Sequence, residues 1–292
     1  QRFTLTARSL LTDGAFERSV DYSDLSIPVT GPVAIDGVRA GDLLRVRIHA
    51  IDIADRGAML TLPGRGAFAD ELRRTGRIVP IADGAAWFDD LGVPVRPMVG
   101  KIGVGVPPPA PGSSTLGDHG GNLDCRHLVA GASVILRVAL DGGLLFAGDL
   151  HACQGDGESS LTAVEVEGRL TLSCERLAPD AWPFDAPVLI GADGDLLTTG
   201  DGADLGEATR TALANMQRLL IDARGWSPED AAMFLSIAAD VGVAQLVNPR
   251  VGATVRLPGR YLAGTPLAHL ADDTGDHQPV PGAPSAPHPA NG

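Results

Sequence analysis

One segment, GDLHACQGDGES at residues 148–159, crowds polar side chains into the end of an apolar run. It contains three carboxylates, one imidazole and one amide: Asp149, His151, Gln154, Asp156 and Glu158. Asp149 and His151 are two residues apart, so on a continuing strand both side chains emerge on one face. Gly155 and Gly157 flank Asp156 and let the backbone fold, which would bring the remaining polar side chains to the same point.

A second segment, GDHGGNLDCRH at residues 117–127, has a similar character. Its polar side chains are Asp118, His119, Asn122, Asp124 and His127. The glycine pair Gly120 and Gly121 permits a tight bend. That bend would aim His119 and Asp124 at a common centre, with backbone N–H groups free nearby.

Carboxylates gathered in this way need a compensating charge, because they repel and raise one another's pKa. A divalent cation removes the repulsion, and imidazole with carboxylate is the ligand set of zinc and related hydrolytic metals. The two segments therefore predict a divalent-metal site, with zinc as the first expectation and calcium as the alternative. Two further possibilities stay open: a solvated acidic loop, and a closed structural zinc site made of Cys125, His127, His151 and Cys153.

Short strands joined by glycine-containing turns are predicted to position these segments. Residues 43–53 alternate, with Leu44, Val46 and Ile48 on one face and arginines on the other. Further strands are predicted at residues 133–140, 143–148, 161–168, 169–177 and 251–258. Sequential short strands connected by tight turns favour an antiparallel sandwich or barrel.

Two helices are predicted between these strands and the end of the chain. DLGE at residues 204–207 has the pattern of a capping box. SPED at residues 227–230 places a serine cap before a proline and two acids, which is typical of a helix start. The apolar face of the second helix is predicted to contain Met233, Phe234, Ile237, Ala238 and Val241.

The predicted fold is mainly β, a jelly-roll-like β-sandwich with an α/β C-terminal part containing two helices, and α+β overall. We predict a sandwich body at residues 1–190 that carries the site motifs. A helix–helix–strand part at 191–262 is expected to pack on it. Residues 270–292, rich in Pro, Ala and Gly, are predicted to form a disordered tail, because they offer little apolar surface to bury.

Charge and composition narrow the classes of function. The 36 acidic and 23 basic residues give a net charge of −13, which repels phosphate backbones, so no nucleic-acid partner is expected. No apolar run approaches the roughly 20 residues that span a membrane. Three cysteines suit a reducing compartment. A cytoplasmic protein with no membrane partner is the expectation.

The two polar segments, with the strands around them, carry a family resemblance. GDHGGNLD, followed by GLLFAGDLHACQGDGE and LTAVEVE, resembles the signature of the acetamidase/formamidase family. The similarity covers about residues 28–262. Cys125 and Cys153 stand at positions where the family pattern accepts different residues. The chain looks short between residues 53 and 87, where substrate-shaping loops are expected.

The resemblance implies hydrolysis of small aliphatic amides to carboxylate and ammonia, a bound divalent metal and a homo-oligomer. It also implies a β-sandwich with an appended α/β part. Carried over by position, the implied metal ligands are His119, Asp124, Asp149 and His151. The remaining polar site candidates are Gln154, Asp156, Glu158 and Glu165.

Our mechanistic hypothesis is metal-assisted attack of water on the amide. Glu158, or failing it Asp156, would take the proton from that water and return it to the departing nitrogen. Asn122 and the neighbouring backbone N–H groups would hold the developing oxyanion. Arg96 or Lys101 could anchor a substrate carboxylate, or simply be charges at a strand edge. Two alternative functions remain: cleavage of another C–N bond (a larger amide, a carbamate or a urea-like compound), and a non-catalytic metal-binding sandwich.

Overall fold

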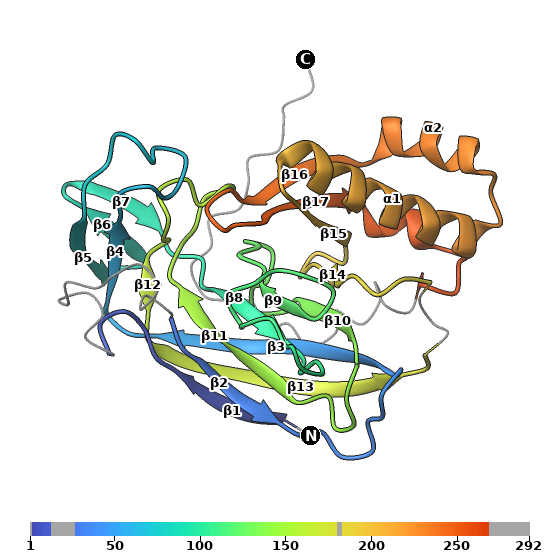
Figure 1. Ribbon diagram of the computed structural model, residues 1–292, viewed down its shortest axis with the longest axis horizontal. Coiled ribbons are helices and arrows are strands. Elements are labelled where there is room, and N and C mark those ends of the chain that lie inside the picture. The colour runs from blue at the N-terminus through green and yellow to red at the C-terminus, as the bar shows by residue number, and fades with distance from the viewer. Residues whose placement is uncertain (1, 13–26, 180–182, 269–292) are drawn as a thin grey trace.

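The computed structural model of the protein describes residues 2–12, 27–179 and 183–268. Its strands form two antiparallel sheets, and two helices lie near the C-terminal end of the described chain (Figure 1). The predicted mainly-β, α+β fold class is confirmed. The predicted tail at residues 270–292 lies outside the described residues, and the division of the chain near residue 190 stays a prediction.

The first sheet has eight strands in the order β1-β13-β3-β10-β14-β15-β17-β16. Their bounds are β1 Arg2–Ala7, β3 Leu43–Ile53, β10 Ser133–Arg137, β13 Gly168–Leu177, β14 Val188–Ile190, β15 Leu196–Gly202, β16 Asp240–Gln245 and β17 Val251–Leu257. β14 pairs with β10 on one side and β15 on the other, so this sheet continues across residue 190.

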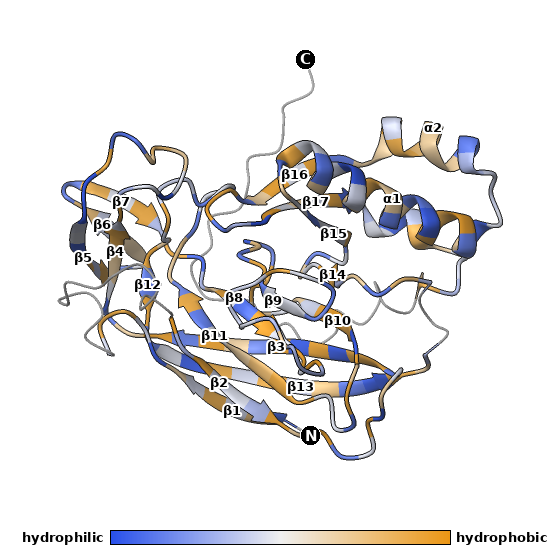
Figure 2. Cartoon of the chain, in the orientation of Figure 1, coloured by the Kyte–Doolittle hydropathy of each residue, from blue (hydrophilic) through white to orange (hydrophobic). Residues whose placement is uncertain are grey.

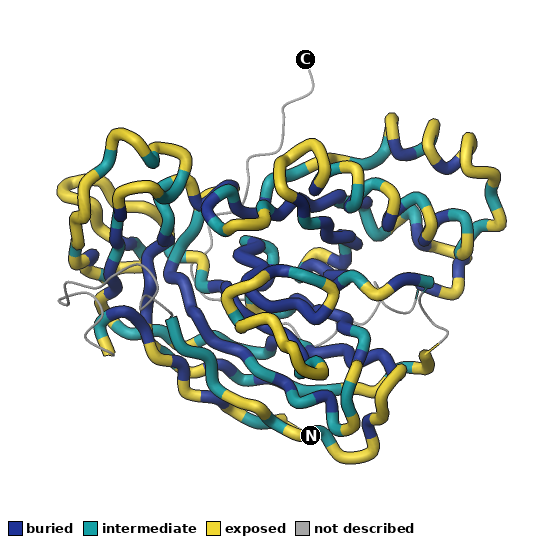
Figure 3. Tube along the Cα trace, in the orientation of Figure 1, coloured by how far each residue is buried: buried dark blue, intermediate teal, exposed yellow. Residues whose placement is uncertain are grey.

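The second sheet has nine strands in the order β7-β6-β5-β4-β12-β11-β8-β9, with β2 paired to β11. Their bounds are β2 Val29–Val33, β4 Arg56–Thr61, β5 Thr75–Ala82, β6 Ala85–Phe88, β7 Leu91–Pro94, β8 Met98–Gly103, β9 Gly120–Asn122, β11 Leu145–His151 and β12 Glu165–Val166. β8 and β11 are neighbouring interior strands, and their residues are buried along most of their length (Figure 3).

The main core lies between the two sheets. Val46 and Ile48 of β3 and Val99 and Ile102 of β8 belong to one hydrophobic cluster, and all four side chains are fully buried. Apolar and polar residues alternate along several strands, including β3 and β13 (Figure 2). Burial of apolar surface stabilises the folded chain by about 25 cal/mol per Å². A shift in the pairing of these strands would expose part of that surface, so burial favours one register.

Several strand predictions agree with the structure and others do not. β3 has the predicted bounds, and β13 and β17 follow the predicted segments closely. Of residues 161–167, however, only Glu165–Val166 is a strand, and Gly168 already begins β13. The preceding residues form a turn in which Leu161 has a φ of 117°, and this turn replaces the expected continuous alternation. β16 was not predicted.

Helix α1 spans Leu205–Arg224 and packs on β15 and β17. The predicted capping box is confirmed: Asp204 Oδ1 accepts from the Glu207 backbone N–H at 2.8 Å, and Glu207 accepts from the Ala203 N–H at 2.7 Å. Gly225 ends the helix with a left-handed φ of 66°. Within the described ranges, no helix is both long and apolar enough to cross a membrane.

Helix α2, Pro228–Ala238, begins at the predicted serine cap, but its predicted apolar face is partly wrong. Met233 and Ile237 are 62% and 84% exposed, whereas Ala231 and Leu235 are buried. α2 contacts α1 along one narrow side, so few of its apolar side chains reach the core. Phe234 packs as predicted, edge-on to Trp226 and Tyr261, whereas Val241 belongs to β16 and not to the helix. A short 3₁₀ turn, η2 at Gly259–Leu262, follows β17.

Candidate active site

Three neighbouring strands of the second sheet carry the central polar side chains. β11 lies between β8 and β12, with His151 opposite Glu165 and Gly148 opposite Lys101. Directly opposed residues of antiparallel strands project from the same face, so the imidazole and the Glu165 carboxylate meet there. Asp149, with a φ of 57°, adopts a left-handed conformation that costs on the order of 1–3 kcal/mol. The surrounding contacts maintain it.

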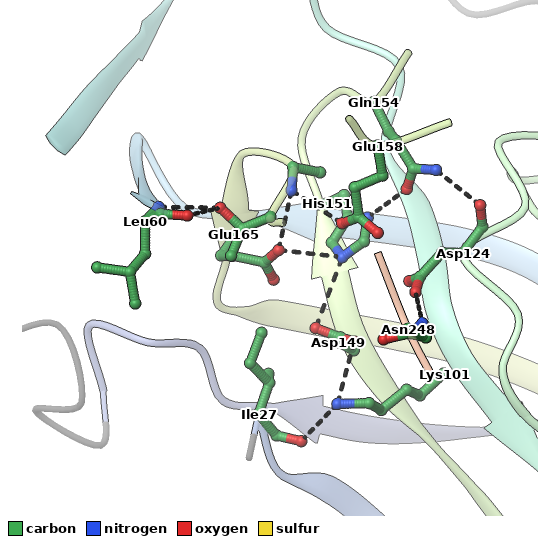
Figure 4. A network of polar contacts seen from close by, with 12 residues as sticks. Ile27, Leu60, Lys101, Asp124, Asp149, His151, Gln154, Glu158, Glu165 and Asn248 are labelled. Atoms are coloured by element: carbon green, nitrogen blue, oxygen red, sulfur yellow. Dashed lines mark hydrogen bonds and ion pairs between the residues drawn. The ribbon is translucent and has the colours of Figure 1, made fainter. Parts of the chain in front are cut away.

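The imidazole of His151 is fixed from both sides (Figure 4). Its Nδ1 lies 2.8 Å from Gln154 Oε1, and Gln154 Nε2 donates to the Asp124 backbone carbonyl at 2.6 Å. Because the amide oxygen can only accept, Nδ1 must carry the proton in this bond. Nε2 therefore keeps a lone pair in the neutral imidazole, 3.5 Å from Asp149 Oδ1 and 3.3 Å from Glu165 Oε1.

Two groups of potential ligand atoms share this imidazole. One contains Asp124, His151 and Glu158, and the other contains Asp149, His151 and Glu165. Within each group the ligand atoms lie within 4.8 Å of one another, and all five residues are buried. The structure thus brings together Asp124, Asp149 and His151 as the sequence predicted, together with two of the predicted polar candidates.

Lys101 supplies a positive charge to this carboxylate cluster. Its Nζ is 3.3 Å from Asp149 Oδ2 and donates to the Ile27 carbonyl at 3.0 Å, while the residue is only 3% exposed. Burial alone would raise the pKa of Asp149, but Lys101 and His151 outweigh it and hold that pKa below its usual range. Burial likewise opposes the charge of Lys101, yet the neighbouring carboxylates raise the Lys101 pKa.

The other carboxyl groups hold their protons more strongly than usual. Burial, with the added repulsion of Asp149, raises the pKa of Asp124 to about 6 and that of Glu165 to about 8. Burial and the charge of Asp124 raise the pKa of Glu158 well above its ordinary value. The four carboxyl groups therefore cannot all be ionised without a further positive charge.

Buried polar atoms without partners show that the site suits a cation. In the described part of the chain, one oxygen each of Asn122, Asp124, Asp149 and Glu165 is buried and accepts no hydrogen bond. Leaving such groups unpaired is costly, and unpaired groups in folded proteins call for a cause such as a bound ion. Oxygen donors around one imidazole nitrogen are the ligand set of a divalent metal, so the residues fit the predicted ion.

Gly100 allows strand β8 to pass directly beside the site. A Cβ there would stand 2.7 Å from Asp124 Oδ1 and 2.9 Å from both the Asp149 carbonyl and His151 Cε1. These separations are shorter than real Cβ contacts allow. A side chain at this position would displace two potential ligands and the imidazole, so Gly100 is part of the site although it carries no reactive group.

A cavity of about 400 Å³ opens onto these groups. Its polar lining includes Lys101, Asn122, Asp124, Asp149, Glu158 and Glu165. Apolar side chains of Ile27, Leu116 and Leu161 complete the wall. A polar, charged floor with apolar walls is the common character of small-molecule sites.

Two residues that touch the cluster were missed or undervalued by sequence reasoning. Asn248 Nδ2 donates to Asp124 Oδ2 at 3.2 Å, although the two are far apart in the chain. No spacing pattern marks Asn248. The composition could have drawn attention to Lys101, because it is the only lysine in the sequence. A chain that otherwise uses arginine keeps its one ammonium group in the interior.

His119, Asn122 and Asp156, also predicted site residues, belong to neither ligand group in the described part of the chain. The His119 ring lies beside Phe146, with centroids 6.3 Å apart. Burial lowers the pKa of His119. Asp156 is exposed and pairs with Arg126 at 3.4 Å. Asn122 lines the cavity.

The alternative Cys2His2 site finds no support in the described residues. Neither Cys125 nor Cys153 joins a candidate ligand group there. Both thiols are unpaired, and burial raises the pKa of each. A thiol that keeps its proton is a poor metal ligand.

The architecture and the buried centre identify a class of protein: mainly β, with two antiparallel sheets and a histidine–carboxylate cluster on interior strands of one sheet. The sequence model of the Acetamidase/Formamidase family matches residues 111–262, just over half of the chain. This chain belongs to the acetamidase/formamidase family, as its motifs predicted.

Solved structures agree over nearly the whole chain. A predicted acetamidase/formamidase from Thermoanaerobacter tengcongensis superposes with a TM-score of 0.83 at 31% identity, covering 89% of this chain and 88% of the other. An acetamidase from Bacillus halodurans gives a TM-score of 0.83 at 32% identity, covering 89% and 90%. A gamma lactamase from Delftia acidovorans, at 20% identity and a TM-score of 0.56, shares the fold over 89% of this chain and 84% of its own.

Curated relatives match over shorter segments. A formamidase from Methylophilus methylotrophus is 45% identical over 56 residues, which is 19% of this chain and 14% of that protein. A relative from Schizosaccharomyces pombe is 44% identical over 61 residues, which is 20% of this chain and 15% of that protein. The matched segments thus span about one-seventh of each curated relative.

Proposed function

We propose that the chain is a metal-dependent amidohydrolase that cleaves small aliphatic amides, such as formamide and acetamide, to a carboxylate and ammonia. The observation that carries the proposal is the position of His151, whose Nε2 faces buried carboxylates while Gln154 holds Nδ1 at 2.8 Å. The names of its relatives, acetamidase and formamidase, support the same reaction.

The proposed metal is zinc, with calcium as the alternative. Asp124, Asp149 and His151 would hold it, with Glu158 or Glu165 beside them. A bound divalent ion lowers the pKa of a water ligand and polarises a carbonyl oxygen. The imidazole in the ligand set favours zinc, because calcium prefers six to eight oxygen ligands.

Glu158 is the proposed general base. It lines the cavity, and its Oε1 accepts from the Ala163 backbone N–H at 2.9 Å, which fixes the carboxyl group. A carboxyl group with a raised pKa can receive a proton from the attacking water and return it to the departing nitrogen. Asp156, the alternative base, is exposed and paired with Arg126, so it serves this role less well.

The developing negative charge on the amide oxygen needs donors on the cavity wall. Asn122 lines that wall and carries an amide N–H group, and the Lys101 ammonium adds a positive charge. Preorganised donors of this kind stabilise an oxyanion without reorganising during the reaction. Small amides offer little binding energy of their own, so most of the rate acceleration would come from these groups.

Assembly as a homo-oligomer and a cytoplasmic location form part of the proposal. The outer strands β6 and β7 expose large apolar side chains, including Trp87, Phe88 and Leu91. Extended apolar patches on a surface commonly mark protein–protein contacts. The free cysteines suit a reducing compartment. Light scattering on the purified chain measures the subunit number directly.

The decisive experiment measures ammonia release from formamide, acetamide and propionamide, before and after chelation and after zinc is restored. The proposal expects release that chelation stops and zinc restores. Glu158→Gln should retain the metal content and lose turnover. If protein shown to carry metal releases no ammonia from any of the three, cleavage of a different C–N bond or a purely structural metal becomes the better account.

A further inference from the structure

A second cavity lies behind the loop that carries Glu158. Its volume is about 540 Å³, and Glu158 and Thr162 line both this cavity and the first. Most of residues 153–164 form one wall. The two cavities therefore adjoin at this loop, so a ligand in the second would lie next to the proposed active site.

The opposite wall is apolar. It is formed by β5, β6 and β7, with Val79 and Ala86 at its buried end and Phe88 and Val93 towards solvent. Phe88 and Val93 are 40% and 45% exposed. Exposed large apolar side chains around a concave surface are characteristic of a binding site for an apolar group.

Two guanidinium groups, of Arg96 and Arg126, line the same cavity. Arg126 pairs with Asp156 at 3.4 Å, a partly exposed contact of small energetic value. Within the described residues, the Arg96 guanidinium makes no hydrogen bond or ion pair, and partial burial together with Arg126 lowers the Arg96 pKa. The Arg96 guanidinium thus lies beside the apolar wall without an ion pair in the described chain, although Asp156 and Glu158 also line this cavity.

We propose that the second cavity binds an apolar organic chain that ends in a carboxylate. The carboxylate would lie on Arg96 and Arg126, since a guanidinium offers two parallel N–H donors to a carboxylate. The chain would lie against Phe88 and Val93. Two sources share this chemistry: a free organic acid, or the far end of a longer amide whose scissile group lies at Glu158.

Calorimetric titration of the full chain with hexanoate tests the site. We expect saturable binding that Arg96→Met weakens at least tenfold, while hexan-1-ol binds much more weakly than hexanoate. Arg169→Met is the matched control, because Arg169 lies on the other sheet in an exposed pair with Asp52, and it should bind like the wild type. Absent binding, or equal affinity in Arg96→Met and the wild type, would overturn the proposal.

The position of the ligand can be measured independently with thiol alkylation. Cys153 lines the second cavity, whereas the half-buried Cys174 lies on β13 of the other sheet. Saturating hexanoate should slow alkylation of Cys153 and leave the Cys174 rate unchanged. An unchanged Cys153 rate at saturation would contradict the assigned location.

Turnover measurements distinguish a free organic acid from the far end of a longer amide substrate. Of the three experiments, only this one depends on the proposed amide hydrolysis. Adipamic acid and hexanamide carry the same scissile amide, but only the former ends in a carboxylate. If the far end of a substrate fills the cavity, Arg96→Met should raise KM for adipamic acid and not for hexanamide. If both substrates respond equally while hexanoate binding still depends on Arg96, the ligand is a free acid. Loss of hydrolysis with intact hexanoate binding would count against the proposed function and not against this site.

Discussion

The Nδ1 of His151 and the Oε1 of Gln154 lie 2.8 Å apart, and this single bond sets the proton on the imidazole. Gln154 is itself held by the Asp124 carbonyl at 2.6 Å, so its oxygen faces the ring. The remaining ring nitrogen is directed at the carboxylates of β11 and β12. Gln154, in the loop three residues after His151, thus leaves Nε2 as the imidazole nitrogen that can bind a metal.

Gln154→Ala should lower amidase activity and metal affinity by roughly 10–100-fold, because partners that orient a ligating imidazole have effects of that size. Metal content after dialysis and kcat/KM for formamide check the prediction. Gln217→Ala is the matched control, since the half-buried Gln217 lies on α1, away from the cluster, and donates to the Pro228 carbonyl. Equal metal affinity in Gln154→Ala and the wild type would show that the bond does not position the ring.

Lys101→Met should destabilise the metal-free protein by about 3–5 kcal/mol, because it leaves the buried Asp149 carboxylate without its cation. The free energy of unfolding in urea measures the effect. Arg169→Met removes the exposed pair with Asp52, whose side chains are 68% and 63% exposed, and should cost less than about 1 kcal/mol. Similar losses in both variants would contradict the role of Lys101.

The metal-free protein should lose stability as the pH rises from about 4.5 to 8. Glu165, whose pKa is raised from 4.5 to about 8, holds in the folded state a proton that the unfolded chain releases. Its stabilising contribution is complete below the unfolded pKa and is lost as the pH passes the folded pKa, at about 1.4 kcal/mol for each unit of difference. Asp124, with its pKa raised to about 6, adds to the loss between about pH 4 and 6.

Unfolding in urea at several pH values after chelation measures this slope. Glu165→Gln cannot ionise, so it should flatten the upper part of the profile. Restored metal should also reduce the loss, because a cation stabilises the ionised carboxylates. A chelated wild type whose stability rises over the same interval would refute the assignment.

Gly100→Ala should abolish metal binding and activity while the protein still folds. The new Cβ would stand within 3 Å of an Asp124 oxygen and of His151, so those side chains must move. Overpacking of this kind costs typically about 1–3 kcal/mol in stability. Gly112→Ala is the control, because a Cβ there meets no atom within 4 Å. Full metal occupancy in Gly100→Ala would show that the strand can shift to accommodate the methyl group.

The family, the fold class, both helix starts and the segments that carry the site could all be predicted from the sequence. These features depend on local chemistry: capping residues act within one turn, and Asp149, His151, Gln154 and Glu158 are close along the chain. The burial of Leu44, Val46 and Ile48 on β3 also followed from the alternation of that strand, although Arg45 on the other face is buried as well.

Which distant groups join that centre could be seen only in the folded chain. Lys101 and Asn248 reach it through strand pairing and through the return of the chain from β16, which no local pattern encodes. Packing also places Met233 and Ile237 in solvent, since the narrow contact of α2 with α1 determines which apolar side chains are buried. Local spacing fixes which residues carry the chemistry, whereas the packing of remote strands fixes the charge around them.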